Sequence, residues 1–266
     1  MASTIFVCSA KSERRVIMLY YLYDGSFEGL LTAIYKAFYS RKDKDKSEPD
    51  FIIKKDNYQA NLFSQTKKIT TEQKKADKVY QAIENKLSKA TLTSIYYAYL
   101  SELKEIEITI YNYLKLGFKK GTQINKFHSN PSVSKIKKTR KKVSRLAHRM
   151  KGLLRFRALA NGVFYAPMEP EHNIIPVITP HFIARFSDQD WIIHDVKREL
   201  AAIYNQDEWV LKKLAKTKLP LAKKEQDYQQ LWQEFFNSIS IKNRHNPKLQ
   251  QQNMPKKHWK YLIEKN

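Results

Sequence analysis

The middle of the chain gathers side chains that could transfer protons or hold a metal ion. Histidines and carboxylates serve as general acids and bases and as metal ligands. This set comprises His148, Glu169, Glu171, His172, Asn173, His181, Arg185, His194, Asp195 and Arg198. Its candidate catalytic residues are Glu169, His172, His181 and Asp195, which would form a site for a nucleic-acid-processing enzyme.

The spacing of these residues matches no catalytic or metal-binding motif. The sequence contains no H-E-x-x-H pair, no G-x-S-x-G turn and no glycine-rich phosphate loop. The separations from His172 to His181 and from His181 to His194 fit no ligand pattern, and a structural hydrogen bond is the simpler interpretation for each histidine. We therefore predict no metal and no cofactor, and the sequence leaves open whether the protein is an enzyme.

A long segment without carboxylates offers another chemistry, the binding of phosphate. Residues 108–168 include no Asp or Glu but fifteen Lys and Arg residues. Like charges on a helix repel one another unless acidic residues one turn away relieve them, so we expect a neutralising partner outside the segment. Nucleic-acid phosphates would serve, with release of counterions, and DNA is the preferred partner over RNA. The alternatives are an acidic protein, or acidic residues of the same fold such as Glu169, Glu171 and Asp195.

A helix beginning near residue 132 would position these cations. Ser132 is the predicted N-cap, and one side of the helical wheel is apolar, with Val133, Ile136, Val143, Leu146, Ala147 and Met150. A strand would follow, with Arg155 and Arg157 on one face. The predicted nucleic-acid-binding residues are Lys135, Lys137, Lys138, Lys141, Lys142, Arg145, Arg149, Lys151, Arg155 and Arg157. Phe127, Phe164 and Tyr165 could stack on bases, but a place in the core is the simpler interpretation.

The remaining patterns predict an α+β fold. A buried strand, a turn and a helix capped by Ser26 come first, and a mostly helical part follows. After the basic helix, the Asn161-Gly162 pair predicts a β-hairpin. A short helix capped by Thr179, further strands in an antiparallel meander and C-terminal helices complete the prediction.

Composition limits the classes of protein that remain. The chain has 266 residues and a formal net charge of +23, which attracts polyanions. Cys8 is the single cysteine, so the chain cannot form an internal disulfide or a multi-cysteine metal cluster. No apolar run approaches the ~20 residues of a membrane-spanning helix. We expect a soluble, cytoplasmic protein that does not bind membranes.

Three blocks of the sequence resemble a known family. They are "LYDGSFEGLLTAIYKAF", the segment from "HRMKGLLRFRALANGVFYAPMEPEHN" through "VKRELAAIYN", and "LWQEFFNSISIKNRHNPKLQQQNMPKKHWKYLIE". In this order they resemble the DNA metabolism or DNA repair family known as domain of unknown function 4130. The similarity predicts a family domain over residues 17–266, with residues 1–16 as an extension. Two lobes, 17–128 and 129–266, could divide it.

The resemblance also implies a partner. Such proteins are associated with a radical-SAM protein, and some relatives are fused to a uracil-DNA glycosylase, a part that this chain lacks. The main hypothesis is therefore a DNA-binding accessory protein that acts with a radical-SAM enzyme. The alternatives are the nucleic-acid-processing enzyme described above and a protein-interaction scaffold for the partner.

Overall fold

The computed structural model describes residues 17–39, 48–216, 219–244 and 246–265 and confirms an α+β fold. The predicted extension at residues 1–16, with Cys8, lies outside the described residues. Chain contacts divide the protein into two compact units. One contains residues up to 93 and residues 104–133, and the other contains residues 94–103 and 134–266. Within the described ranges, no helix is both long and apolar enough to cross a lipid bilayer.

The first unit combines a parallel sheet with helices. Its strands are β1 (Met18–Tyr23), β2 (Phe51–Lys54) and β3 (Ser64–Lys68), and its helices include α1 (Phe27–Tyr39), α2 (Gln73–Lys86) and α4 (Ile106–Lys120). Helix α3 (Lys89–Leu100) has residues in both units. The strand order is β2-β1-β3, and β1 pairs in parallel with both neighbours. The sequence analysis did not predict β3, which is polar and largely exposed.

A network of short polar side chains begins α1. The Ser26 hydroxyl accepts a hydrogen bond from the Gly29 backbone N–H at 2.9 Å and donates one to Asp24 at 2.6 Å. Thr71 donates to the other carboxylate oxygen of Asp24 at 2.8 Å. The prediction of Ser26 as the N-cap is therefore confirmed. A methyl group at position 29 would lie 2.2 Å from Asp24 Oδ1, so the network requires glycine there.

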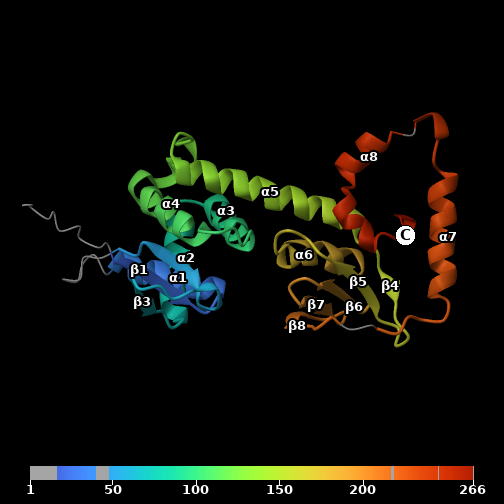
Figure 1. Ribbon diagram of the computed structural model, residues 1–266, viewed down its shortest axis with the longest axis horizontal. Coiled ribbons are helices and arrows are strands. Elements are labelled where there is room, and N and C mark those ends of the chain that lie inside the picture. Colours follow the sequence, from blue (N-terminus) through green and yellow to red (C-terminus); the bar gives the residue numbers. More distant parts are fainter. Residues whose placement is uncertain (1–16, 40–47, 217–218, 245, 266) are drawn as a thin grey trace, which may run out of the picture. The chain divides into compact units, whose positions relative to one another are not determined.

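The second unit is built around a five-stranded mixed sheet (Figure 1). Its strands are β4 (Arg157–Ala158), β5 (Phe164–Met168), β6 (Trp191–Asp195), β7 (Leu200–Tyr204) and β8 (Trp209–Lys213). They follow one another in sequence order across the sheet. All neighbours are antiparallel except β5 and β6, which are parallel and are connected through α6 (Ile175–Arg185). The predicted hairpin is confirmed, with Gly162 at a φ of +86° in the turn.

Two predicted helix starts were wrong. Helix α5 (Pro131–Leu153) begins one residue before Ser132, and Asn130 caps it by accepting from the N–H groups of Ser132 and Val133 at 3.0 and 3.3 Å. Helix α6 begins at Ile175 rather than at Thr179, whose hydroxyl instead donates to the Ile175 carbonyl within the helix. In both cases a side chain that can cap a helix lies inside it.

The core of the second unit lies between α5, α6 and the sheet. Trp191, Ile193 and Ala166 of the sheet are fully buried, together with Val143 of α5 and Ile178 of α6. All six apolar positions predicted for the buried side of α5 are buried, which confirms that side of the helix. The Lys and Arg side chains therefore occupy the opposite side of α5.

The C-terminal segment completes this core. It contains α7 (Glu225–Ser238), α8 (Pro247–Asn253) and short 3-10 turns at Lys256–Tyr261 and Ile263–Lys265. Leu262 belongs to the core, and Trp259 packs against it. The predicted C-terminal helices are confirmed.

Candidate nucleic-acid interface

The outer side of α5 is a row of cations. We call Lys137, Lys138, Lys141, Lys142 and Arg145 the basic face, and all five are exposed. Lys135, Arg149 and Lys151 are partly buried at its borders, and Arg140 is also exposed. At 1.5 Å per residue, the stretch from 137 to 149 is about 18 Å long, enough to follow several phosphates of a duplex.

Within the described part of the chain, no carboxylate forms an ion pair with a cation of α5. The acidic residues that could have neutralised the helix pair with other cations. Glu169 accepts from Lys260 at 2.7 Å and from the Tyr261 hydroxyl at 2.6 Å. Glu171 pairs with Lys257, and Asp195 pairs with Arg198 at 2.8 Å. The charge of the basic face is therefore available to an external anion.

A polar hollow lies at the C-terminal half of the basic face. It is lined by Ser144, Arg145, His148, Arg149 and Asn253, the last residue of α8. Arg149 donates to the Gln252 carbonyl at 3.4 Å, which holds this guanidinium beside the end of α8. Two guanidinium groups, a hydroxyl and an amide can donate several hydrogen bonds to one phosphate group.

A buried histidine lies close enough to Arg149 of this hollow for the two to interact electrostatically. His258 is only 4% exposed, and its Nε2 atom has no hydrogen-bond partner. Burial, with smaller contributions from the charges of Lys257 and Arg149, lowers the pKa of His258 to about 4. The imidazole is therefore neutral at physiological pH and adds no charge to the interface.

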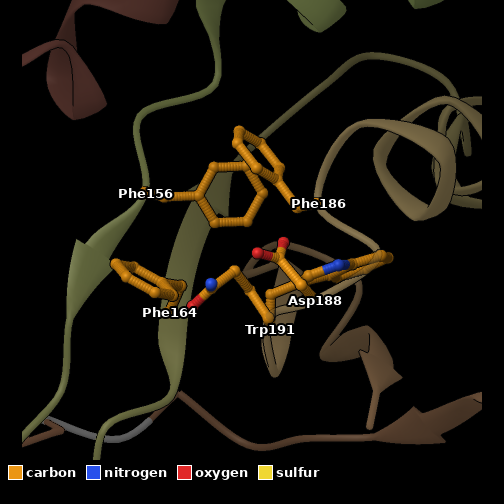
Figure 2. A pocket seen from close by; sticks show the side chains of 6 residues that line it. Phe156, Phe164, Phe186, Asp188 and Trp191 are labelled. Atoms are coloured by element: carbon orange, nitrogen blue, oxygen red, sulfur yellow. The ribbon is translucent and has the colours of Figure 1, made fainter. Parts of the chain in front are cut away.

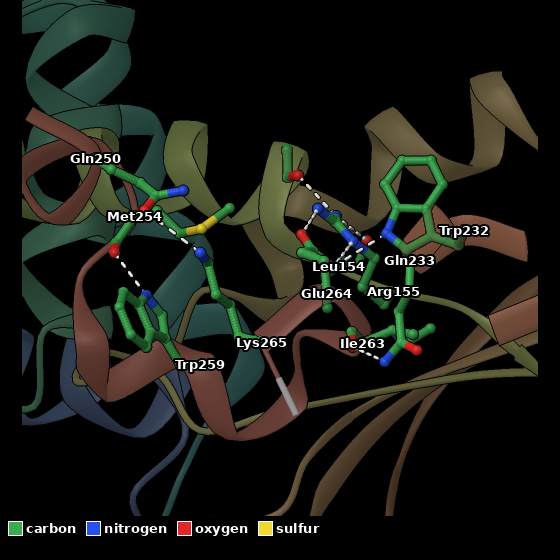
Figure 3. A network of polar contacts seen from close by, with 11 residues as sticks. Leu154, Arg155, Trp232, Gln233, Gln250, Met254, Trp259, Ile263, Glu264 and Lys265 are labelled. Carbon is green, nitrogen blue, oxygen red and sulfur yellow. Dashed lines mark hydrogen bonds and ion pairs between the residues drawn. The ribbon is translucent and has the colours of Figure 1, made fainter. Parts of the chain in front are cut away.

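Two of the predicted binding residues occupy interior positions. Arg155 follows the end of α5, and its guanidinium forms a two-point ion pair with Glu264, with N–O distances of 3.1 and 2.5 Å (Figure 3). The same guanidinium lies 5.3 Å from the centre of the Trp232 ring. Arg157 is half-buried in β4, and its Nε atom is buried without a partner. Since β4 contains only Arg157 and Ala158, the predicted strand alternation of Arg155 and Arg157 was wrong.

The four candidate catalytic residues have separate environments. Glu169 is held by Lys260 and Tyr261, and these two hydrogen bonds lower the pKa of its carboxyl group. His181 lies on α6 with its ring against Phe182, and its pKa is lowered by burial and then by Lys151 and Arg185. No group of three or more His, Cys, Asp or Glu side chains within the described ranges could hold a metal ion.

Arg198 binds both Asp195 and the loop carbonyls that precede His172, an arrangement that the sequence patterns did not reveal. Arg198 donates to Asp195 at 2.8 Å and to Glu102 at 2.7 Å, and it also donates to the carbonyls of Pro170 and Glu171. The His172 Nδ1 atom donates to the Ser101 carbonyl at 2.9 Å. Asp195 is fully buried, and burial raises its pKa although Arg198 opposes the shift. No local pattern could reveal Glu102, because it precedes Arg198 by 96 residues.

His194, beside Asp195 on β6, has both ring nitrogens engaged. Its Nε2 atom lies 2.9 Å from the Leu214 carbonyl, which can only accept, so Nε2 carries the proton. Its Nδ1 atom then accepts from the Tyr165 hydroxyl at 2.8 Å. Burial lowers the pKa of His194 and raises that of Tyr165. This pair connects strands β5 and β6 and leaves the His194 ring no free nitrogen for a substrate.

The fold and the surface together define a mixed α+β protein with an exposed basic helix whose cations pair with no described carboxylate. Residues 104–264, more than half of the chain, match the family described as a domain of unknown function (DUF4130), and the chain belongs to this family. No curated protein and no solved structure matches the chain.

Proposed function

We propose that the protein binds DNA through the basic face of α5 and acts as an accessory protein in DNA metabolism or repair. The observation that carries this proposal is the absence of any described carboxylate paired with the cations of α5. The hollow formed with Asn253 provides a place for one phosphate group. A helix of this charge is stabilised by a polyanion outside the chain.

We further propose that a radical-SAM enzyme is the partner, as the family resemblance implies. Helix α7 supports a protein partner because apolar side chains along one side of it are exposed. These are Tyr228, Leu231, Trp232, Phe235 and, at the C-cap, Ile239, whose positions on a helical wheel fall within about 100° of one another. The role as a scaffold thus complements DNA binding and uses a different surface.

An enzymatic role at Glu169, His172, His181 and Asp195 is the alternative. Glu169, His172 and Asp195 already have hydrogen-bond partners within the fold. A general base needs a lone pair that can reach the substrate proton, and Asp195 is fully buried behind Arg198. We therefore prefer binding as the function of this chain.

The DNA-binding role is tested with a fluorescent duplex and a single strand titrated over a salt series. The triple variant Lys138→Glu, Lys141→Glu, Arg145→Glu should bind more weakly. If all three side chains contact phosphates, the slope of log affinity against log salt should become shallower by about 2.7 for duplex DNA.

A matched control separates a contact surface from overall charge. Lys212 and Lys213 are exposed on β8, at the other edge of the sheet from β4, and Lys223 is exposed just after the residues that pair with Ala158 and Leu159. Their triple change to Glu alters the net charge equally and should leave most of the affinity and slope intact. Equal losses in the two triple variants would contradict a DNA interface on α5.

The partner is tested by copurification with the radical-SAM protein after nuclease treatment. Leu231→Glu and Phe235→Glu should abolish capture, because charge on an apolar contact is costly to bury. The triple variant of the basic face should still be captured. If the α7 variants are still captured and the triple variant is not, the partner binds the basic face of α5 instead.

A further inference from the structure

An aromatic pocket opens at the turn between α6 and β6. Its volume is about 380 Å³, and its lining consists of Phe156, Phe164, Phe186, Asp188, Gln189 and Trp191 (Figure 2). This volume is at the lower end of the range for ligand sites in proteins, so the pocket suits a small or single-ring-system ligand.

The rings of this pocket are fixed by one another. Phe156 meets Phe186 edge to face at 5.3 Å and 72°, and it meets Trp191 at 6.4 Å and 71°. Trp191 is fully buried and forms part of the core, while Phe156, Phe164 and Phe186 are only partly buried. Rigid aromatic surface therefore remains accessible, and it can stack on a planar ligand.

Two polar side chains of the lining have no partner among the described residues. Neither the Asp188 carboxylate nor the Gln189 side-chain amide forms a hydrogen bond or an ion pair with any residue that the structure describes. The neighbouring Asp190, by contrast, accepts from Gln206 at 3.0 Å. Figure 2 shows the carboxylate of Asp188 projecting into the space between the aromatic rings. Although the chain has a net charge of +23, the Asp188 carboxylate is therefore available to accept hydrogen bonds from a ligand.

A cation lies next to the pocket. The Arg185 guanidinium, exposed at the end of α6, is 5.6 Å from the centre of the Phe186 ring. Aromatic faces bind bases, carboxylates accept from exocyclic amines of bases, and guanidinium groups bind phosphates. A nucleotide unites these three kinds of group in one ligand.

We propose that this pocket binds one unstacked nucleobase of a nucleic-acid strand. The base lies against the rings of Phe156, Phe164 and Phe186, its edge meets Asp188 and Gln189, and the phosphate meets Arg185. Because a carboxylate only accepts, bases with an exocyclic amine are favoured over thymine. That the base comes from a DNA strand rests on the proposed function. That the pocket accepts a nucleobase rests only on its own residues.

The test uses the full chain and four separate probes, dAMP, dCMP, dGMP and dTMP, with binding followed by ligand-observed NMR and competition. The three amine-bearing nucleotides should bind more tightly than dTMP. Asp188→Ala should remove this preference and weaken their binding about tenfold. Phe186→Leu keeps the apolar volume but removes an aromatic face, and it should weaken all four.

Asp188 is exposed, so Asp188→Ala tests the pocket without risk to the core, and circular dichroism checks the fold of Phe186→Leu. Equal binding of dTMP and the other nucleotides, unchanged by both variants, would overturn the proposal. So would failure of all four to bind while a phenylalanine-bearing peptide binds. The basic-face triple variant should leave nucleotide binding unchanged, so the failure of DNA binding on α5 and the failure of the pocket are distinguishable.

Discussion

Arg155 and Glu264 form an ion pair across 109 residues of sequence. The side chain of Glu264 has no solvent exposure, and that of Arg155 has 17%. The Trp232 indole N–H also donates to Glu264 at 3.1 Å, so the carboxylate has three donated hydrogen bonds. The pair attaches the C-terminal segment and α7 to the end of α5.

Removing one member of this pair should destabilise the protein strongly. Glu264→Gln leaves the guanidinium of Arg155 without its counter-charge, which typically costs about 3–5 kcal/mol in a buried pair. Urea unfolding measures the loss. The double variant Arg155→Met, Glu264→Gln should recover part of it, whereas strictly additive losses would show that the pair is not coupled.

Glu264 also predicts loss of stability in acid. Burial alone would raise its pKa, but the hydrogen bonds from Arg155 and Trp232 lower the pKa overall. A carboxyl group with a lowered folded pKa stabilises the protein above its unfolded pKa of about 4.3, and this stability disappears as pH falls through the folded value. Unfolding experiments below pH 4.3 should therefore show a smaller difference between wild type and Glu264→Gln than at pH 7.

His258 predicts a second loss of stability in acid, which begins at a higher pH than that of Glu264. Its folded pKa of about 4 lies below the unfolded value of about 6.5, so the unfolded chain binds a proton first. Stability should fall as pH decreases from about 6.5 to 4, by up to about 3 kcal/mol. NMR titration should show the His258 ring neutral at pH 5.5. A protonated His258 at pH 5.5 would contradict this prediction.

The basic face predicts a conflict between binding and stability. Lys141 has Lys137 and Arg145 one helical turn away on either side, and these like charges repel one another. A Glu at position 141 would attract both neighbours instead. Lys141→Glu should therefore raise the melting temperature, by the equivalent of roughly a few tenths of a kcal/mol, while it weakens DNA binding. Lys141→Gln removes the charge without adding a new one, so its melting temperature and DNA affinity should lie between those of wild type and Lys141→Glu. Destabilisation by Lys141→Glu in low salt would show that the cations already have internal partners.

Arg198 predicts a pH-dependent cost. Arg198→Met leaves Asp195 buried without its donor, which should cost about 3–5 kcal/mol at pH 7. Because the pKa of Asp195 is already raised by burial, loss of Arg198 raises it further. A raised pKa contributes stability below the unfolded value near 3.9 that is lost as pH rises through the folded value. The variant should therefore be closest to wild type in acid, and Asp195→Asn should rescue part of its stability at neutral pH.

The sequence predicted those parts of the fold in which the local pattern decides the structure. The apolar side of α5, the Ser26 cap and the hairpin at Gly162 depend on neighbours within a few residues. The prediction of Ser132 as the cap of α5 was wrong because Pro131 fits the first helical turn and Asn130 lies before it.

What sequence patterns missed depends on distant partners. Strand β3 has no apolar alternation because its side chains are largely exposed, and only its pairing with β1 defines it. The sequence predicts Arg155 as part of an exposed cationic surface, but the folded chain pairs it with Glu264. The aromatic pocket was missed for the same reason, since Phe156, Phe186 and Trp191 meet only in the folded chain.

The ion pair of Arg155 with Glu264 also affects the order of folding during synthesis. When a ribosome has made α5 and all five strands of the second unit, neither Glu264 nor the core residue Leu262 has yet been added. Arg155 then has a charge without a counter-charge, and part of the core is open to water. Assembly of this unit is therefore a late step, and the emerging chain carries its basic helix throughout the synthesis of the strands and the C-terminal segment before that helix has a completed domain beneath it.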